Sequence, residues 1–410
     1  MKRYVIVGNG TAAAGAIEGI RDTDKEGSIT VISEEMHPVY SRPLISNLLE
    51  GKTDEERMSY RDSDFYDRNG CSVIYGKKAT GIRDDIREVY LSDGTVVPYD
   101  ELLIATGSSP FVPPFKGLDT VEERYSFMTL DDALDLREAV KEDTRVFIVG
   151  GGLIGLKCAE GLRSITKDIT VTDLQKNILS SILDTASSKL MQKHLEENGI
   201  TFLLGDNAER FEVDKAYMRT GKTVEFDVLV LAVGVRPNIS LIKDIGGETG
   251  RAITVNCRME TSVPHIYAAG DCTETKDVSS GTVKVMALMP NAYMEGHTAG
   301  VNMAGGSSKF SEAIPMNSIG LFGLHAMTAG SYEGEAFEEV KEKSIKRLFT
   351  KDGLLKGFIL VGADERAGIY TRMIRERIPL ETVDFEMLKR TASTAAFGEK
   401  SRRRVFGGLI

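Results

Sequence analysis

The stretch Val5-Ile-Val-Gly8-Asn-Gly10-Thr-Ala-Ala13 decides the fold, and Val146-Phe-Ile-Val-Gly150-Gly-Gly152-Leu-Ile-Gly155 repeats its pattern. In each, a short apolar run predicts a buried strand, which ends at glycines where a helix is expected to begin. The glycines permit a tight turn and let the backbone approach a pyrophosphate, and the positive end of the helix dipole faces that group. Two such turns in one chain predict two bound dinucleotides.

An acidic residue follows the second predicted strand of each unit. The strand expected over residues 28–33 leads to Glu34, with Glu35 as the alternative, and the corresponding strand of the second unit leads to Asp173. A carboxylate at this point can accept hydrogen bonds from the hydroxyls of an unphosphorylated ribose. Ala13 replaces the third glycine of the first unit, which the motif allows. The alternative interpretation of either unit is an ordinary strand-to-helix turn with incidental glycines.

Length and composition favour a large enzyme of two or three domains, with 410 residues of which 41% are hydrophobic. No run of about 18 apolar residues is present, so we expect no membrane span. The first predicted strand begins close to Met1, which leaves no room for a signal peptide and predicts a cytoplasmic protein. The net charge of −10 argues against a nucleic-acid partner.

Cysteine and histidine spacing predicts no metal site. The four cysteines, Cys71, Cys158, Cys257 and Cys272, are too far apart for a Cys-x-x-Cys or metal-ligand pattern and are interpreted as reduced thiols. The five histidines are equally scattered. His37 is the only one close to a predicted dinucleotide site, and we interpret it as a surface or loop histidine.

The two halves of the chain follow one plan. After the first unit, Asp93-Gly94 predicts a hairpin turn and Leu102-Leu-Ile-Ala-Thr-Gly107 a buried strand; after the second, Thr220-Gly221 and Val228-Leu-Val-Leu-Ala-Val-Gly234 do the same. The strand Ile266-Tyr-Ala-Ala-Gly-Asp271 has no earlier counterpart. We therefore expect the first domain to resume there, around an inserted second domain.

The predicted fold class is α/β, with two Rossmann-like domains, the second inserted in the first, and a small α+β domain at the C-terminal end. The expected boundaries are residues 1–115 and 246–309 for the first domain, 116–245 for the second and 310–410 for the last. The last domain is expected to contain a strand at 357–362, a helix at 366–376 and a polar tail.

Five motifs in this order resemble the two-dinucleotide-binding flavoproteins of the pyridine-nucleotide oxidoreductase superfamily, whose domains are of the glutathione-reductase type. They are the first glycine turn, Tyr40-Ser-Arg42-Pro43, Ala105-Thr-Gly107, the second glycine turn, and Ala269-Gly-Asp271. The resemblance covers residues 1 to about 330 and is greatest to rubredoxin and ferredoxin reductases, apoptosis-inducing factor and the reductase part of nitrite reductases. It implies FAD in the first domain and NAD(H) in the second.

The resemblance also implies roles for individual residues: Arg42 near the flavin diphosphate, Thr106-Gly107 against FAD, and Asp271 on the ribityl chain. A helix expected to begin at Pro290-Asn-Ala292 would place its N-terminus near the negative charge of a reduced flavin. The predicted residues are Gly8, Gly10, Ala13, Glu34, Arg42, Ala105, Thr106, Gly107, Asp271 and Ala292 for FAD, and Gly150, Gly152, Gly155, Asp173 and Gly234 for NAD(H).

Departures from the family pattern bear on the chemistry. Disulfide reductases carry a cysteine pair early in the flavin domain, and the peroxidase and oxidase branch carries one cysteine there, whereas residues 34–51 contain none. Electrons are therefore expected to pass directly from flavin to acceptor. Ferredoxin reductases pair a lysine with a glutamate near flavin N5, and the matching positions here are Asn47 and Lys157. We predict both as catalytic residues, with a solvated helix lysine as the alternative for Lys157.

The segment at residues 355–370 resembles flavoproteins associated with carbon monoxide dehydrogenases and 2-oxoacid oxidoreductases of anaerobes. We therefore predict an FAD-dependent NAD(H) oxidoreductase that exchanges electrons with a small iron–sulfur carrier, a ferredoxin or rubredoxin, including one of a carbon monoxide dehydrogenase system. The alternatives are a peroxide-forming NADH oxidase and a slow-turnover, redox-sensing interaction protein. The basic tail residues Lys400, Arg402, Arg403 and Arg404 are a predicted docking site, or else a solvated chain end.

Overall fold

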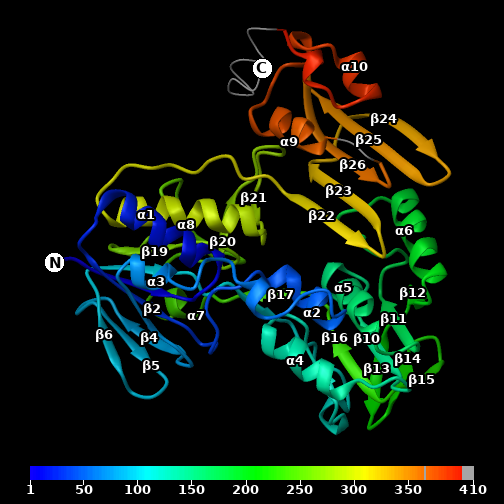
Figure 1. Cartoon of the computed structure of the whole chain (residues 1–410), viewed down its shortest axis with the longest axis horizontal. Helices are drawn as coiled ribbons and strands as arrows, with labels where there is room; N and C mark the ends of the chain where they lie inside the picture. Colours follow the sequence, from blue (N-terminus) through cyan, green and yellow to red (C-terminus); the bar gives the residue numbers. More distant parts are fainter. Residues whose placement is uncertain (364–365, 399–410) are drawn as a thin grey trace.

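The computed structural model describes residues 1–363 and 366–398; the basic tail at residues 400–404 lies outside them. Two parallel sheets of five strands each form the centre of the molecule (Figure 1). The first has the order β19-β7-β1-β2-β3 and the second β12-β11-β10-β16-β9. The strands of the first sheet are β1 (Arg3–Val7), β2 (Ser28–Ile32), β3 (Cys71–Ile74), β7 (Glu101–Ile104) and β19 (Ile266–Ala268). Those of the second are β9 (Arg124–Tyr125), β10 (Val146–Val149), β11 (Ile169–Asp173), β12 (Thr201–Leu204) and β16 (Val228–Leu231).

The order of the strands confirms the predicted fold class. β19 pairs in parallel with β7, although the whole second sheet lies between them in the sequence. The central strands β1, β7, β10 and β16 read as uninterrupted apolar runs because helices or loops cover both faces of a parallel sheet. A three-stranded antiparallel sheet follows each unit, and the two turns predicted at 93–94 and 220–221 lie in them. These sheets are β4 (Ala79–Arg83), β5 (Glu88–Leu91) and β6 (Val96–Pro98), and β13 (Ala208–Glu212), β14 (Lys215–Met218) and β15 (Thr223–Glu225).

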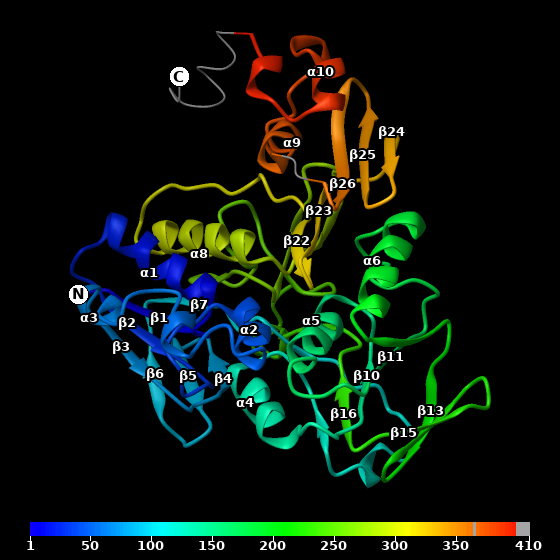
Figure 2. The same cartoon turned by 45° about the vertical axis from the view of Figure 1, so that its right-hand side comes forward.

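Helices α1 (Thr11–Thr23) and α8 (Met289–Met303) pack against each other unusually closely (Figure 2). Small residues make this approach possible. A Cβ atom at Gly296 would collide with the carbonyl oxygen of Ala12, and one at Gly300 with that of Ala16. The contact fixes α8, whose beginning matches the prediction, relative to the first glycine turn.

The chain crosses between the two sheets at one place. β8 (Ser108–Pro110) and β17 (Val235–Pro237) pair antiparallel, with Ser109 opposite Arg236. These strands follow β7 and β16 directly. Both crossings therefore lie side by side, at the carboxyl ends of the strands, where parallel α/β sheets bind their ligands.

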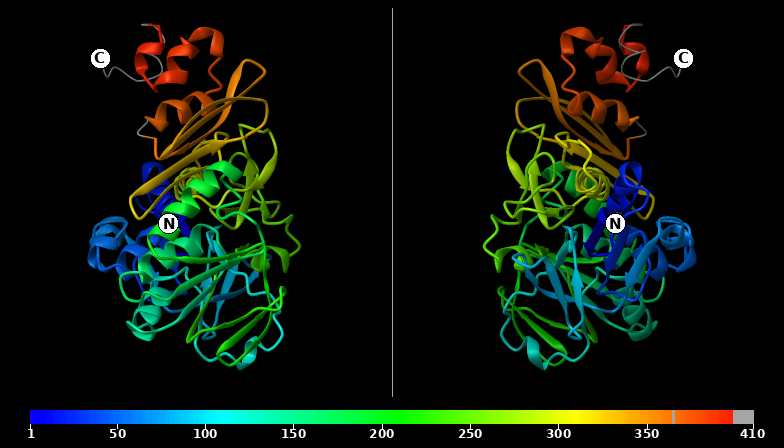
Figure 3. Two further views of the ribbon diagram at one scale, coloured as in Figure 1. Left: turned by 90° about the vertical axis from the view of Figure 1, so that its right-hand side faces the viewer. Right: turned by 90° about the vertical axis from the view of Figure 1, so that its left-hand side faces the viewer.

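The C-terminal part is an antiparallel sheet of order β22-β23-β26-β25-β24 with helix α9 (Ala367–Arg375), which matches the predicted helix. Its strands are β22 (Met316–Leu321), β23 (Leu324–Gly330), β24 (Glu335–Lys341), β25 (Ser344–Lys351) and β26 (Leu354–Val361). It sits above the other two sheets (Figure 3), and the β22–β23 hairpin reaches α5 (Leu153–Leu162) and α6 (Thr185–Glu197) of the second unit.

The remaining elements are α2 (Ile45–Leu49), α3 (Phe65–Arg68), α4 (Leu130–Ala139), α7 (Ser240–Lys243), α10 (Phe385–Arg390), β18 (Ile253–Thr254), β20 (Thr273–Lys276) and β21 (Val283–Val285). None of the helices in the described ranges has the length and apolar composition needed to span a bilayer.

Candidate functional site

The first glycine of each predicted turn is needed for the backbone conformation of that turn. Gly8 has φ of +112° and Gly150 has φ of +121°. A Cβ atom at Gly8 would collide with the carbonyl oxygen of Ala105, and one at Gly150 with that of Ala232. Only glycine combines this conformation with so close an approach. Each glycine thus locks its turn onto the end of the neighbouring strand, β7 or β16.

The middle glycines face open space. Gly10 is the N-cap of α1 and Gly152 the N-cap of α5, and a Cβ atom on either would meet no atom within 4 Å. No side chain caps either helix, so the first backbone N–H groups remain available to a phosphate. Gly107 and Gly234, which follow β7 and β16, are equally open. The structure therefore brings two matching, open glycine turns to the carboxyl ends of the two sheets.

Asp173 ends β11 beside the second glycine turn. Its Oδ2 accepts a hydrogen bond from Gly151 N at 2.7 Å, and its Oδ1 accepts one from Gln175 N at 2.7 Å. These backbone donors hold the carboxylate over the glycine turn. This is the placement that the ribose interpretation requires.

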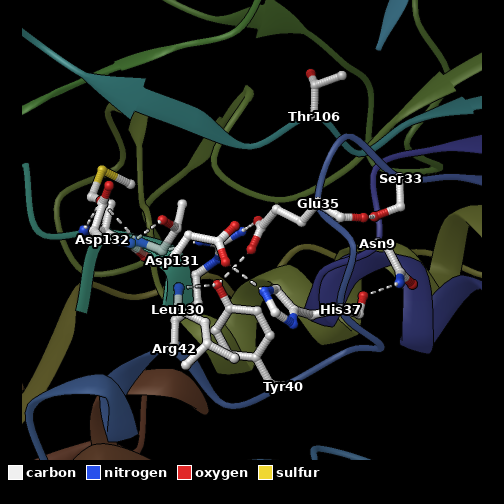
Figure 4. Close-up of polar contacts among 12 residues, drawn as sticks. Asn9, Ser33, Glu35, His37, Tyr40, Arg42, Thr106, Leu130, Asp131 and Asp132 are labelled. Carbon is white, nitrogen blue, oxygen red and sulfur yellow. Dashed lines mark hydrogen bonds and ion pairs between the residues drawn. The ribbon is translucent and has the colours of Figure 1, made fainter. Parts of the chain in front are cut away.

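In the first unit, the two candidate acids lie in different surroundings. Glu34 is 66% exposed and pairs with Lys78 at 3.0 Å, whereas the Glu35 side chain is 23% exposed. Tyr40 donates a hydrogen bond to Glu35 Oε2 at 2.7 Å, and Arg42 pairs with Glu35 Oε1 (Figure 4). The geometry favours Glu35, the alternative, as the acid of the first site.

The same cluster joins the first unit to the second. Arg42 Nη1 donates to the carbonyl of Met128 at 2.9 Å, and the Tyr40 hydroxyl accepts a hydrogen bond from Leu130 N at 2.9 Å. His37 pairs with Asp131 at 2.7 Å, so it is a partnered loop histidine, as interpreted from the sequence (Figure 4). Arg42 therefore lies between Glu35 and the beginning of α4.

Asn238, at the end of the β8–β17 ribbon, binds the predicted Thr106-Gly107 turn. Its side-chain amide donates to Thr106 O at 2.8 Å and its backbone N–H to Gly107 O at 3.0 Å, while Thr106 Oγ1 donates to Asn238 O at 3.0 Å. No motif pointed to Asn238, because its role depends on the pairing of two crossings far apart in the sequence.

Asp271 lies between the ribbon and α8. Ser108 Oγ donates to Asp271 Oδ2 at 3.3 Å, and a cavity of about 370 Å³ beside them is lined also by Arg236, Arg251 and Ala287. Burial raises the pKa of Asp271, while Ser108 and the charge of Arg42 oppose that rise. A carboxylate with one neutral donor retains free lone pairs for the hydroxyls of a polyol.

Two buried residues fix the turn that carries Asp271. Gly270, with φ of +84°, lies against the methyl groups of Ala12 and Ala292. Glu295 of α8 is 2% exposed and accepts a hydrogen bond from Gly270 N at 2.8 Å. Ala292, a predicted site residue, thus contacts the turn itself, and Glu295 is a residue that sequence reasoning missed.

Lys157 has local partners. Its Nζ pairs with Glu160 and donates to the carbonyl of Gly320 at 3.3 Å. Glu160, 5% exposed, also accepts a hydrogen bond from Phe322 N at 2.6 Å. Lys157 is therefore not a free solvated side chain, and it connects α5 to the β22–β23 hairpin. Asn47 lies on α2, which packs against α5 at Gly161.

All four cysteines are free thiols. Burial raises the pKa of Cys71 to about 11, that of Cys272 to about 12 and that of Cys158 still further. Such thiols are poor nucleophiles near neutral pH. Cys257 is exposed and lies in a loop after β18.

Known proteins are similar to this chain over most of its length. A family model described as pyridine nucleotide-disulphide oxidoreductase matches residues 2–296. The chain is 33% identical over 393 residues to subunit epsilon of the NADH-dependent phenylglyoxylate dehydrogenase of Aromatoleum evansii, covering 92% of each chain. It is 30% identical over 400 residues to the NADH oxidase of Methanocaldococcus jannaschii, covering 89% of this chain and 88% of that one.

Among solved structures, the chain is similar to the NADH:rubredoxin oxidoreductase of Clostridium acetobutylicum. The TM-score is 0.74 at 25% sequence identity, and the match covers 93% of this chain and 95% of that one.

Proposed function

The chain belongs to the pyridine nucleotide-disulphide oxidoreductase family, and from that premise we propose that it carries electrons between NADH and a small one-electron iron–sulfur protein. It is an FAD-dependent NAD(P)H oxidoreductase. The observation that carries the proposal is the pair of open glycines, Gly10 and Gly152, at matching positions of two sheets joined by one ribbon. Two dinucleotides can thus be held, one at the carboxyl end of each sheet.

The residues present fit FAD in the first unit. Gly10 and the α1 N-terminus would hold the pyrophosphate, Glu35 the ribose, and Asp271 the ribityl hydroxyls. Asp173 would hold the ribose of NADH in the second unit. When bound, FAD takes a hydride as two electrons and releases them singly, which suits a one-electron acceptor. The domain boundaries expected from the sequence stay a proposal, and the chain passes between the two units at the β8–β17 ribbon.

A direct route from flavin to acceptor is supported by the cysteines. Burial raises the pKa of Cys71, Cys158 and Cys272, and Cys257 lies exposed in a loop after β18. The acceptor that we propose is a ferredoxin or rubredoxin. We propose that this acceptor belongs to a 2-oxoacid dehydrogenase system, because a subunit of an NADH-dependent phenylglyoxylate dehydrogenase is among the relatives. A carbon monoxide dehydrogenase system rests only on the resemblance of residues 355–370 and stays the alternative.

Anaerobic turnover tests this function. We expect NADH to reduce ferredoxin or rubredoxin rapidly, and oxygen consumption to be slow by comparison. Peroxide formation faster than iron–sulfur reduction would instead favour the NADH oxidase, which the Methanocaldococcus relative makes the second candidate. Slow turnover with every acceptor, together with a long-lived NADH-reduced complex, would favour the redox-sensing protein.

Lys157→Met is expected to destabilise the fold and to slow reduction of the flavin by NADH. The substitution leaves the buried Glu160 without its cation. The expected loss is about 1–3 kcal/mol, below the range for a fully buried pair, because 25% of the Lys157 side chain is exposed. Thermal or urea unfolding and stopped-flow flavin bleaching measure the two effects separately.

The double variant Lys157→Met/Glu160→Gln separates stability from chemistry. Replacing both charges should restore much of the lost stability, because no unpaired carboxylate remains. Flavin reduction should stay slow if Lys157 also acts at the flavin. Wild-type reduction rates in this double variant would limit Lys157 to holding the β22–β23 hairpin.

A further inference from the structure

Glu295 is a buried carboxyl group directly behind the turn that carries Asp271. Its Oε2 lies 2.8 Å from Gly270 N and 3.1 Å from Thr273 Oγ1, and its Oε1 lies 3.3 Å from Thr275 Oγ1. Thr273 Oγ1 also lies 2.7 Å from the carbonyl oxygen of Gly270. These contacts form a closed network around the Gly270–Asp271 turn.

The number of protons available for hydrogen bonding in this network determines whether Glu295 is protonated. A threonine hydroxyl has one proton to donate. The carbonyl of Gly270 is the nearer acceptor for Thr273, at 2.7 Å against 3.1 Å for Glu295 Oε2. An ionised Glu295 would then face a lone pair of Thr273 Oγ1 with no proton between them. A protonated Oε2 donates to Thr273 Oγ1 while still accepting from Gly270 N, and every group is satisfied.

In the part of the chain that the structure describes, no cation compensates a charge on Glu295. Within residues 1–363 and 366–398, no lysine, arginine or histidine forms an ion pair with Glu295. The neighbouring acids have their own partners: Glu18 of α1 binds Arg61, and Asp277 binds Lys284. Asp271, in the turn itself, adds repulsion, and the Arg42 charge acts on Asp271.

We propose that Glu295 is a positioning residue for the Gly270–Asp271 turn, and that it acts as a neutral carboxylic acid donating its proton to Thr273. It acts on FAD only through Asp271, whose carboxylate the turn directs toward the cavity. The proposal rests on the assignment of FAD to the first unit, but it does not depend on the identity of the electron acceptor.

The pH dependence follows from burial. Burial, with the charge of Asp271 adding to it, raises the pKa of Glu295 from 4.5 to about 7, against the lowering effect of the hydrogen bonds that Glu295 accepts, such as that from Gly270 N. Between these two values the folded protein binds more protons than the unfolded chain, so the stability contributed by this group falls as pH rises across that window. Above pH 7, ionisation should loosen the turn and weaken FAD binding by up to about tenfold per pH unit.

Infrared difference spectroscopy of the FAD-loaded enzyme tests the protonation state. At about pH 6, below that pKa, we expect a carbonyl band of a protonated carboxyl group that disappears in Glu295→Gln. Glu101→Gln is the matched control, because Glu101 is also buried but pairs with Lys2 at 3.1 Å. The band should persist in the control. A band unchanged in Glu295→Gln, or absent from the wild-type protein, would overturn the proposal.

FAD dissociation measured across pH 6 to about 9 tests the positioning role. Glu295→Gln keeps a neutral hydrogen-bond donor at this position. The variant should bind FAD at every pH with the affinity that the wild type has at pH 6, and this affinity should not fall above pH 7. Thr273→Val should weaken FAD binding at every pH. Equal pH dependence in wild type and Glu295→Gln would contradict the inference alone, whereas a colourless wild-type protein would contradict the FAD assignment.

Discussion

Gly10→Leu is expected to give a folded protein without flavin, and Gly152→Leu a yellow protein that NADH no longer reduces. Both positions have space for a side chain in the protein itself, since a Cβ atom meets nothing within 4 Å. The leucine would instead fill the volume that a pyrophosphate occupies beside the helix N-terminus. Flavin absorbance per protein and anaerobic NADH titration measure the two losses.

The two variants control for each other. Each replaces an N-cap glycine with a poorer cap, at a similar cost of about 1 kcal/mol, so a difference in flavin content cannot come from helix stability. Full flavin content in Gly10→Leu would remove FAD from the first unit. Loss of flavin in Gly152→Leu, with flavin retained in Gly10→Leu, would reverse the assignment of the two sites.

Asp173→Ala is expected to narrow the preference for NADH over NADPH by about 10- to 100-fold, since a hydrogen bond to a charged group contributes about 1.5–3 kcal/mol. The carboxylate, held by Gly151 N and Gln175 N, would accept bonds from the ribose hydroxyls and repel a 2′-phosphate. Comparison of kcat/KM for the two nucleotides gives the ratio.

Asp173→Asn provides the control. The substitution removes the charge but keeps an acceptor oxygen. It should therefore reduce the preference for NADH chiefly by raising kcat/KM for NADPH. Equal kcat/KM for NADH and NADPH in the wild-type enzyme would show that Asp173 does not determine the choice.

The sequence predicted the features that lie within one short segment. Both glycine turns, the strand leading to Asp173 and the beginning of α8 follow from local pattern and turn chemistry, and the structure contains them where expected. The insertion of the second sheet was also predictable, because the strand that forms β19 had no counterpart in the sequence before the second unit.

Contacts between distant segments were not predictable. Asn238 on Thr106, Ser108 on Asp271 and Glu160 on Phe322 each join residues more than 100 positions apart. The choice between Glu34 and Glu35 also depends on contacts of this kind. Both residues follow β2, which ends at Ile32, in an irregular segment, and only the packing of Tyr40 and Arg42 against Glu35 distinguishes their surroundings.

Because of the β8–β17 ribbon, the second unit of this enzyme could be exchanged as one continuous segment. Ser109 and Arg236 are hydrogen-bonded neighbours across the ribbon, so the chain leaves the flavin half and re-enters it at one point. Joining the chain across that point would close the flavin half with a short loop at little entropic cost. Exchanging the segment between these two residues would replace the whole second unit, and the new segment would have to keep the contacts of Met128 and Leu130 with Arg42 and Tyr40.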